Sequence, residues 1–198
     1  MMKRPLAGVG ILIILFLSQP VHAGAPLDTV QENVTKVLEV LRDPALKAES
    51  AKEIKKEKLR PIYNRMFDDV ELSRRTLARN WNTLNTPQRQ EFVQLFRQVL
   101  EKAYVDKILS YTDEKIVYDK ESLLSENQSE VPTRIVTSSK SIPISYRMIM
   151  KDGLWKIYDV VIENVSLVQN YRTQFNEILA KNTPEQLLET LRKKVKEQ

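Results

Sequence analysis

Apolar residues recur every three or four positions through most of the first half of the chain. They do so over residues 27–41, 62–70 and 92–108, and this spacing puts them on one face of an α-helix. Thr86-Pro87 predicts the start of the third helix, with a capping hydroxyl followed by proline at the first helical position. We therefore predict that the first half of the domain is helical.

The stretch between the first two apolar segments is dominated by lysine and glutamate. Residues 45–58 interleave five lysines with three glutamates, which predicts a solvated helix with weak ion pairs, although a partner-docking patch remains an alternative. Pro61 is expected in the first turn of a new helix, because proline is tolerated there. The sequence thus predicts a boundary near residue 60.

Beyond Tyr111 the period of the apolar residues changes to two, which is typical of β-strands. Residues 114–120, 131–138, 142–151 and 154–163 are predicted strands. Asp152-Gly153 between the last two is a strong two-residue hairpin signal. Counting outward from this turn pairs Lys151 with Leu154 and places Asp159 opposite Tyr146, together with Val161, on the apolar face of the hairpin.

Two further helices close the chain. Capping signals at Ser166 and Thr183 precede apolar repeats that run through Phe175 and Leu191. Helices, then an antiparallel meander, then helices predict an α+β domain, with helices packed on one face of a curved antiparallel sheet of about four strands and an apolar cavity enclosed between the layers.

The first 23 residues have the pattern of a secretory signal peptide. Lys3 and Arg4 precede an apolar run, and Val21-His22-Ala23 supplies small residues for cleavage after Ala23. We expect an exported protein, with residues 24–198 forming one domain. Without the leader, the charge is 29 − 26 = +3, which is too weak to indicate a nucleic-acid binder and fits anionic head groups or acidic partners better.

Composition excludes several kinds of site. The chain has no cysteine, and its one histidine lies in the leader. Zinc or copper sites built on these residues and Ser-His or Cys-His nucleophiles are therefore excluded, and we expect no metal and no cofactor. Two glycines, Gly24 and Gly153, remain outside the leader, too few for a glycine-rich phosphate loop.

Carboxylates are the remaining candidates for chemistry. Asp68-Asp69, Asp113-Glu114 and Asp119 lie beside lysines or in turn-like contexts, and we expect them to be solvated surface groups. Asp159 differs, because its expected position on an apolar face needs a partner or the mouth of a cavity. A small cone-shaped α+β enzyme that uses Asp159 and Tyr146 as an acid-base pair is therefore kept as an alternative to a binding protein.

Asp152–Phe175 reads DGxWKxYDVxIExVSLxxNYRxQF, where x stands for a residue that is not part of the pattern. This run closely resembles the toluene-tolerance family, the MlaC-type components of the Mla lipid-transport system of Gram-negative bacteria. Leu77–Trp81 and Thr86–Phe92 are similar to the middle region of that family. Asn80 stands where a bulkier residue is expected, which leaves the choice between a phospholipid, a hopanoid and another apolar ligand open.

The resemblance implies a periplasmic phospholipid carrier rather than an enzyme. It further implies shuttling between an outer-membrane lipoprotein complex and an inner-membrane ABC-type transporter complex, with no nucleic acid bound, and we expect a monomer. Arg74, Arg75 and Arg79 are the expected contacts to head groups or partners. The side chains expected to line the lipid cavity come from the long helix, the hairpin and the following helix: Phe92, Phe96, Leu100, Tyr104, Ile144, Tyr146, Met148, Trp155, Ile157, Val161, Tyr171 and Phe175.

Overall fold

The structure is a computed structural model that describes residues 25–111 and 114–197. The predicted leader and its cleavage site lie outside the described residues. The helices are α1 (Pro26–Arg42), α2 (Lys52–Met66), α3 (Asp69–Leu77), α4 (Thr86–Leu109), α5 (Leu167–Leu179) and α6 (Pro184–Glu197), with short 3-10 turns η1 (Pro44–Leu46), η2 (Glu49–Ala51) and η3 (Ala78–Thr83) between them. The strands are β1 (Lys115–Tyr118), β2 (Ser122–Ser125), β3 (Gln128–Val136), β4 (Ser141–Lys151), β5 (Leu154–Ile162) and β6 (Val165–Ser166).

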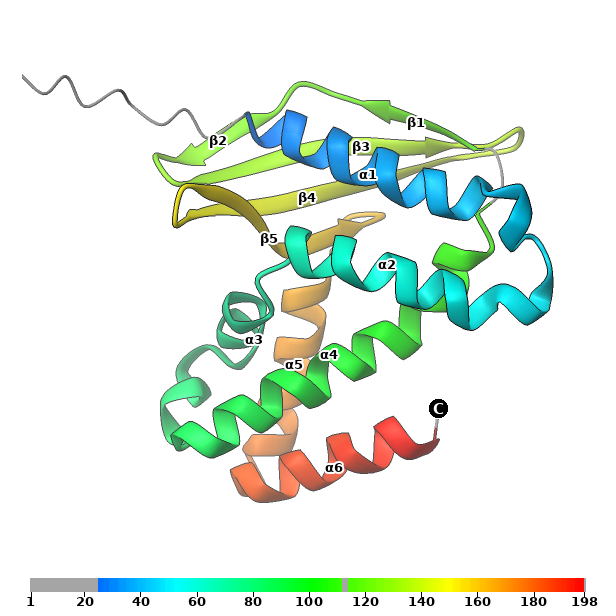
Figure 1. Ribbon diagram of the computed structural model, residues 1–198. Helices are drawn as coiled ribbons and strands as arrows, with labels where there is room; N and C mark the ends of the chain where they lie inside the picture. Colours follow the sequence, from blue (N-terminus) through cyan, green and yellow to red (C-terminus); the bar gives the residue numbers. More distant parts are fainter. Residues whose placement is uncertain (1–24, 112–113, 198) are drawn as a thin grey trace, which may run out of the picture.

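All strand pairs of the sheet are antiparallel. The order is β1-β3-β4-β5-β6, and β2 pairs with β3 as well. Helices α1 and α2 lie across the sheet, where α1 contacts β3 and α2 contacts β5 (Figure 1). Helices α3 and α5 contact β5, and α4 packs between α3 and α6. The predicted α+β architecture is confirmed, and the four predicted strands form as β1, β3, β4 and β5. The strands β2 and β6 were not predicted.

The β4–β5 hairpin forms as its turn sequence predicts. Asp152 and Gly153 both have positive φ, at 51° and 77°, as a type I′ turn requires. Lys151 pairs with Leu154, and the expected register continues as far as Met148 and Ile157.

A β-bulge then shifts the register. Arg147 pairs with Asp159 and Tyr146 pairs with Val160, so Tyr158 is the extra residue on β5. Because successive side chains of a strand alternate between faces, Asp159 lies on the opposite face from Tyr146. The expected pairing of Asp159 with Tyr146 is therefore wrong, and Val161 is displaced from the apolar face for the same reason.

Two helix boundaries also differ from the expectations. Helix α2 runs continuously through Pro61. Proline has no N–H to donate to the backbone carbonyl of Glu57 one turn earlier. Because both residues are exposed, water can hydrate that carbonyl instead. Before α2, the chain forms η1 and η2 instead of a longer helix. Helix α4 is capped by Asn85, whose side chain accepts from the Gln88 N–H at 2.9 Å, one residue before the predicted cap.

Buried side chains form two apolar clusters instead of one. The first cluster joins α3–α6 and is made of Leu72, Leu77, Leu84, Phe92, Phe96, Val99, Leu100, Val168, Tyr171, Phe175, Leu187, Leu188 and Leu191. The second cluster joins α1 and α2 to the sheet and is made of Val30, Val34, Met66, Val131, Met148, Trp155, Ile157, Val160 and Leu167. Phe67 and Tyr104 pack against both clusters and connect them. Within the described residues, no helix is long and apolar enough to cross a bilayer.

Candidate functional site

The second cluster lies between the α1–α2 pair and one face of the sheet. Its rim consists of partly buried apolar side chains from three strands, from the helices α1, α2 and α4, and from the residue after α2: Leu27, Leu38, Ile62, Phe67, Tyr104, Ile116, Tyr118, Ile144, Tyr146, Met150 and Ile162. These eleven rim residues outnumber the nine buried members of the cluster. The second cluster is therefore an apolar layer that stays accessible at its margin.

The first cluster is closed by comparison. Its thirteen buried members outnumber seven partly buried ones, and Phe92 and Phe96 have no exposed surface. Their rings contact α5 edge to face, with centroids 5.4 Å apart for Phe92–Phe175 and 4.9 Å for Phe96–Tyr171. Such pairs stabilise a packed core beyond the area they bury. The first cluster is thus the structural core of the helical part.

The structure does not bring the twelve expected lining residues together. Five lie in the first cluster (Phe92, Phe96, Leu100, Tyr171 and Phe175), and five lie in the second cluster or its rim (Ile144, Tyr146, Met148, Trp155 and Ile157). Tyr104 contacts both clusters. Val161 faces away from the second cluster, beside Asp159. The α1 and α2 residues Val30, Val34, Ile62 and Met66 were not among the expected residues, although the apolar stripe of α1 is visible in the sequence.

The polar groups of the second cluster are few. Thr133 on β3 is 3% exposed, and its hydroxyl donates to the Ile144 carbonyl at 2.9 Å. Burial raises the pKa of the Tyr146 hydroxyl to about 12, so this phenol stays neutral throughout the physiological range. The cluster therefore presents neutral, apolar chemistry to anything bound against it.

A buried polar contact holds the end of α2 to α3 and α4. The Tyr63 hydroxyl donates to Asp69 Oδ1 at 2.5 Å, and Arg97 Nη1 lies 3.4 Å from Asp69 Oδ2 and over the Tyr63 ring. Burial raises the pKa of Asp69, and the hydrogen bond from Tyr63 and the charge of Arg97 only partly oppose this. Asp68 is 7% exposed and pairs with Lys151 at 2.6 Å. Both carboxylates were expected to be solvated, and that expectation is wrong.

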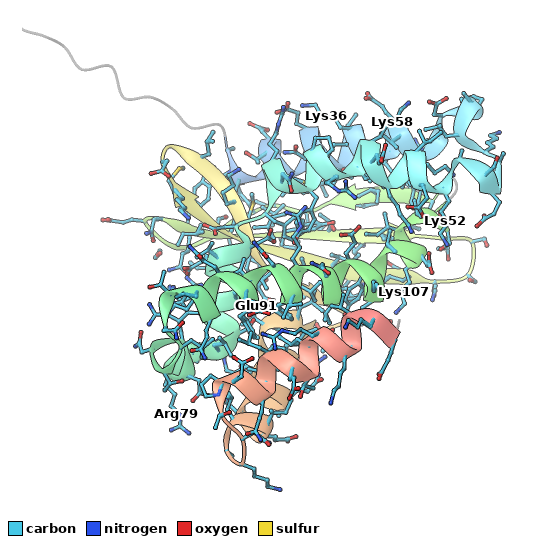
Figure 2. The ribbon with its side chains drawn as sticks, turned by 60° about the horizontal axis from the view of Figure 1, so that its bottom comes forward. Lys36, Lys52, Lys58, Arg79, Glu91 and Lys107 are labelled. Atoms are coloured by element: carbon cyan, nitrogen blue, oxygen red, sulfur yellow. The ribbon has the colours of Figure 1, made fainter. Side chains whose placement is uncertain are left out.

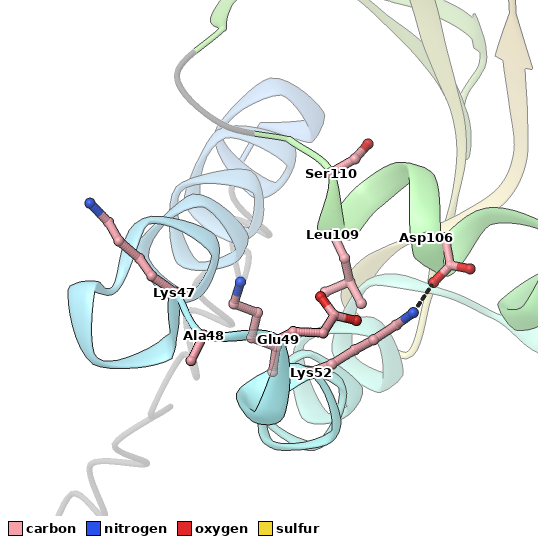
Figure 3. A pocket seen from close by; sticks show the side chains of 8 residues that line it. Lys47, Ala48, Glu49, Lys52, Asp106, Leu109 and Ser110 are labelled. Carbon is pink, nitrogen blue, oxygen red and sulfur yellow. Dashed lines mark ion pairs between the residues drawn. The ribbon is translucent and has the colours of Figure 1, made fainter.

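The other end of α2 is held at the surface. Lys52 pairs with Asp106 on α4 at 2.8 Å, across a polar pocket of about 200 Å³ (Figure 3). Met66, at the end of the helix beyond Tyr63, is the one buried residue of α2. A helix with so little buried surface depends on its end contacts for its position, and α2 is therefore the least firmly packed wall of the second cluster.

Asp159 caps α5 rather than meeting Tyr146. The residue is 2% exposed, and its carboxylate accepts from Ser166 Oγ at 2.6 Å, Val168 N at 3.0 Å and Arg147 Nη1 at 3.3 Å. A carboxylate at a helix N-terminus with three donors is satisfied as a structural anion. The Asp159–Tyr146 acid-base pair of the enzyme alternative is not formed.

Other residues of the DGxWKxYDVxIExVSLxxNYRxQF run have structural contacts as well. Arg172 Nη2 and Nε donate to the Arg75 carbonyl at the end of α3, at 2.6 and 3.0 Å. The Tyr158 ring lies 3.8 Å from the Arg75 guanidinium carbon. These side chains line a second, polar pocket of about 580 Å³. Arg172, Tyr158 and Asp159 of this motif thus hold α3 and α5 to each other and to β5.

The three arginines expected at head groups or partners have different environments. Arg74 and Arg75 both bind the Glu71 carboxylate, at 2.7 and 2.6 Å, and these hydrogen bonds, Arg74 first, lower the pKa of Glu71. Arg79 is exposed, has no ion-pair partner among the described residues and projects from the molecule far from α2 (Figure 2). Asn80, the unexpected residue before Trp81, donates to Asn176 Oδ1 on α5 at 2.7 Å.

Two pockets formed by described residues can be compared with the expected apolar cavity, and neither matches it. The pocket beside Lys52 and the pocket beside Arg172 are both lined mainly by polar side chains, and side chains of the second cluster meet between the sheet and α1–α2. Of the described residues, no three His, Cys, Asp or Glu side chains are grouped to hold a metal ion. Apolar contact is therefore the chemistry that the second cluster offers.

Comparisons with known proteins agree with this arrangement. The chain is 23% identical over 177 residues to toluene tolerance protein ttg2D of Pseudomonas putida, covering 88% of this chain and 82% of that protein. It is 26% identical over 101 residues, about half of each chain, to the intermembrane phospholipid transport system binding protein MlaC of Haemophilus influenzae. A phospholipid-binding protein from Ralstonia solanacearum, solved in complex with a phospholipid, has the same fold, with a TM-score of 0.80 over 88% of this chain and 98% of that one at 18% identity.

A family model settles the wider assignment. The model described as MlaC protein matches residues 31–193. This range takes in most of α1, the whole sheet with its bulged hairpin and most of α6, and so covers nearly all residues of both clusters. The chain belongs to the MlaC protein family.

Proposed function

We propose that this protein binds a phospholipid through its acyl chains and carries it across an aqueous space. The observation that supports the proposal most directly is the second cluster, in which partly exposed apolar side chains outnumber buried ones. Apolar side chains that stay partly accessible around a cluster are typical of the edge of a ligand-binding site. The names of the MlaC and Ttg2D relatives and the phospholipid complex of the Ralstonia protein support the same ligand class.

The energetics explain why such a carrier needs an apolar layer and no catalyst. Burial stabilises a methylene by about 0.8 kcal/mol, so two acyl chains with roughly thirty methylenes represent on the order of 24 kcal/mol before ordering costs. A free lipid therefore leaves a bilayer slowly. A protein that offers comparable apolar contact removes most of this barrier.

We place the acyl chains between the sheet and the α1–α2 pair. The first cluster is closed around Phe92 and Phe96, whereas α2 buries one residue along its length. Displacement of α2 would open the second cluster along Ile62 and Ile144 without disturbing α3–α6. The polar contacts of Tyr63 and Lys52 at the two ends of α2 would then resist this opening.

The finer parts of the proposal concern place and partners. We propose that the protein works in the periplasm and exchanges lipid with an inner-membrane ABC-type complex and an outer-membrane lipoprotein complex, as its relatives' names and the leader-like first 23 residues suggest. Of the three arginines, Arg79 is the one whose charge is available to a head group or partner, since Arg74 and Arg75 are engaged by Glu71.

Native mass spectrometry of protein purified from a Gram-negative periplasm tests lipid binding. We expect a co-purifying lipid whose mass identifies a phospholipid, and a hopanoid mass would instead support the alternative ligand. A protein that emerges without lipid, and shows no saturable uptake of a fluorescent phospholipid after delipidation, would contradict the proposal.

Matched substitutions test the location. Ile62→Gln changes the rim of the second cluster, and Ile178→Gln makes the same change at the rim of the first. We expect Ile62→Gln to weaken lipid uptake about tenfold, because a polar group would face the acyl chains. Ile178→Gln should leave uptake within twofold, and equal losses in both variants would argue against the assigned site.

A further inference from the structure

One buried polar atom on α1, beside the second-cluster residues Val30 and Val34, has no partner. Asn33 on α1 is 2% exposed, and its Oδ1 makes no hydrogen bond with any described residue. It is the one buried side-chain nitrogen or oxygen of which this is true within residues 25–111 and 114–197. Buried side-chain oxygens without a donor are rare in folded proteins, and each calls for an explanation.

The orientation of the Asn33 amide is fixed. Its Nδ2 donates to the Thr29 carbonyl one turn earlier at 2.8 Å. Exchanging the nitrogen and the oxygen would put two acceptors against each other, so Oδ1 must point away from Thr29. The amide atom without a hydrogen-bond partner is therefore the oxygen, Oδ1.

The buried hydroxyls on the nearest face of β3 do not supply the missing donor. Its neighbours Val30 and Val34 belong to the second cluster, which Val131 of β3 completes from the sheet. The buried hydroxyls on that face of β3 are already used, because Ser129 Oγ donates to the Ser122 carbonyl and Thr133 Oγ1 donates to the Ile144 carbonyl. A hydroxyl has one hydrogen to donate, so neither can serve Asn33.

Helix formation does not explain Asn33 either. Asparagine is a poor residue for a helix interior compared with alanine or leucine, and this one lies within the 17-residue helix α1. A leucine would bury its side chain in the second cluster at no polar cost. A bound ligand that supplies the missing donor would explain why an amide occupies this position.

We propose that Asn33 Oδ1 is a polar subsite that accepts a hydrogen bond from the polar part of the bound lipid. The inference rests on the proposed function and adds to it a ligand chemistry: a lipid that carries a hydroxyl or an ammonium donor, such as phosphatidylglycerol or phosphatidylethanolamine. Phosphatidylcholine has no such donor in its head group. Asn33 would thus select among phospholipids that have identical acyl chains.

The test compares these three lipids on the delipidated full-length protein. Competition binding should show phosphatidylglycerol and phosphatidylethanolamine bound about five- to tenfold more tightly than phosphatidylcholine, the ratio expected for one hydrogen bond. Asn33→Leu should abolish this preference and keep phosphatidylcholine affinity within twofold. The thermal midpoint of the empty Asn33→Leu protein should not fall, whereas a purely structural role would lower it.

The controls separate the possible failures. Asn64→Leu makes the same change at an exposed position of α2 and should leave the lipid ranking unchanged, and Asn33→Ala repeats the test should leucine not be accommodated. A wild-type protein that binds all three lipids equally, or an Asn33→Leu protein that keeps the ranking, would overturn the subsite while leaving lipid binding intact. Absence of binding to any of the three would reject the proposed function itself.

Discussion

The Asp159 carboxylate accepts the Val168 N–H at 3.0 Å and so ties the first turn of α5 to the middle of β5. This contact exists because the bulge at Tyr158 turns Asp159 toward α5 instead of toward the second cluster. Ser166 and Arg147 complete the shell of donors. The relationship assigns Asp159 to the assembly of the fold.

Asp159→Asn should therefore destabilise the protein without abolishing lipid binding. An amide at this position would turn one donor toward other donors inside a buried site, and we expect a loss of about 3 kcal/mol in the free energy of unfolding. Urea denaturation measures it. Asp119→Asn, at a surface pair with Arg134, is the control and should cost less than about 1 kcal/mol.

The same variant decides the enzyme alternative. If Asp159→Asn abolished the biological function of the protein while its free energy of unfolding and its lipid loading stayed unchanged, Asp159 would be catalytic. Reduced stability with retained lipid loading would agree with its role as a buried acceptor for the first turn of α5.

Ala78 has a backbone conformation that suits glycine. It lies at φ 49° and ψ −122° at the end of α3, a region that disfavours any Cβ. Ala78→Gly should raise the free energy of unfolding by about 1 kcal/mol, because the strain relieved exceeds the entropy added to the unfolded chain. Ala180→Gly, at an ordinary helical φ of −67°, should lower it by about 0.5–1 kcal/mol, and a loss at both positions would contradict the account.

Asp69 should make stability depend on pH with an unusual sign. Its pKa is raised from the ordinary value of 3.8, mainly by burial. The folded protein therefore binds more protons than the unfolded chain as pH rises past that value, and the free energy of unfolding falls across this window. Urea denaturation of the wild type and of Asp69→Asn, repeated at several pH values between 3 and about 6, gives the free energy of unfolding of each protein. The wild-type value minus the Asp69→Asn value at each pH isolates the contribution of Asp69. A difference that rises with pH would contradict it.

The sequence predicts the parts of this fold in which side chains repeat regularly. The α1 stripe, the Asp152-Gly153 turn and the Ser166 cap appear as expected, because each depends on local spacing or turn chemistry. The bulge is not visible in the sequence, since Ile157, Tyr158 and Val160 are all apolar enough to fit either register. Tertiary packing alone decides which of them faces α1.

The candidate site was only half predictable for a related reason. The stripes that contain Phe96 and Ile144 are both apolar. Periodicity does not reveal whether two such stripes pack against each other or whether each packs against a different element. The structure pairs Phe96 with Phe175 and Tyr171, whereas Ile144 joins the cluster that α1 and α2 cover. The role proposed for Asn33 could not be predicted from the sequence, because a single amide within an apolar stripe is a weak signal.

The two tryptophans provide a direct test of where the acyl chains lie. Trp155 belongs to the second cluster and Trp81 packs against the first, and the chain contains no other tryptophan. Phospholipid with brominated acyl chains quenches tryptophan at close range, so it can be bound to Trp81→Phe and Trp155→Phe in parallel. The account predicts strong quenching of Trp155 in the Trp81→Phe protein and little quenching of Trp81 in the Trp155→Phe protein. Quenching of Trp81 with Trp155 unaffected would contradict the central claim that the lipid lies between α1–α2 and the sheet.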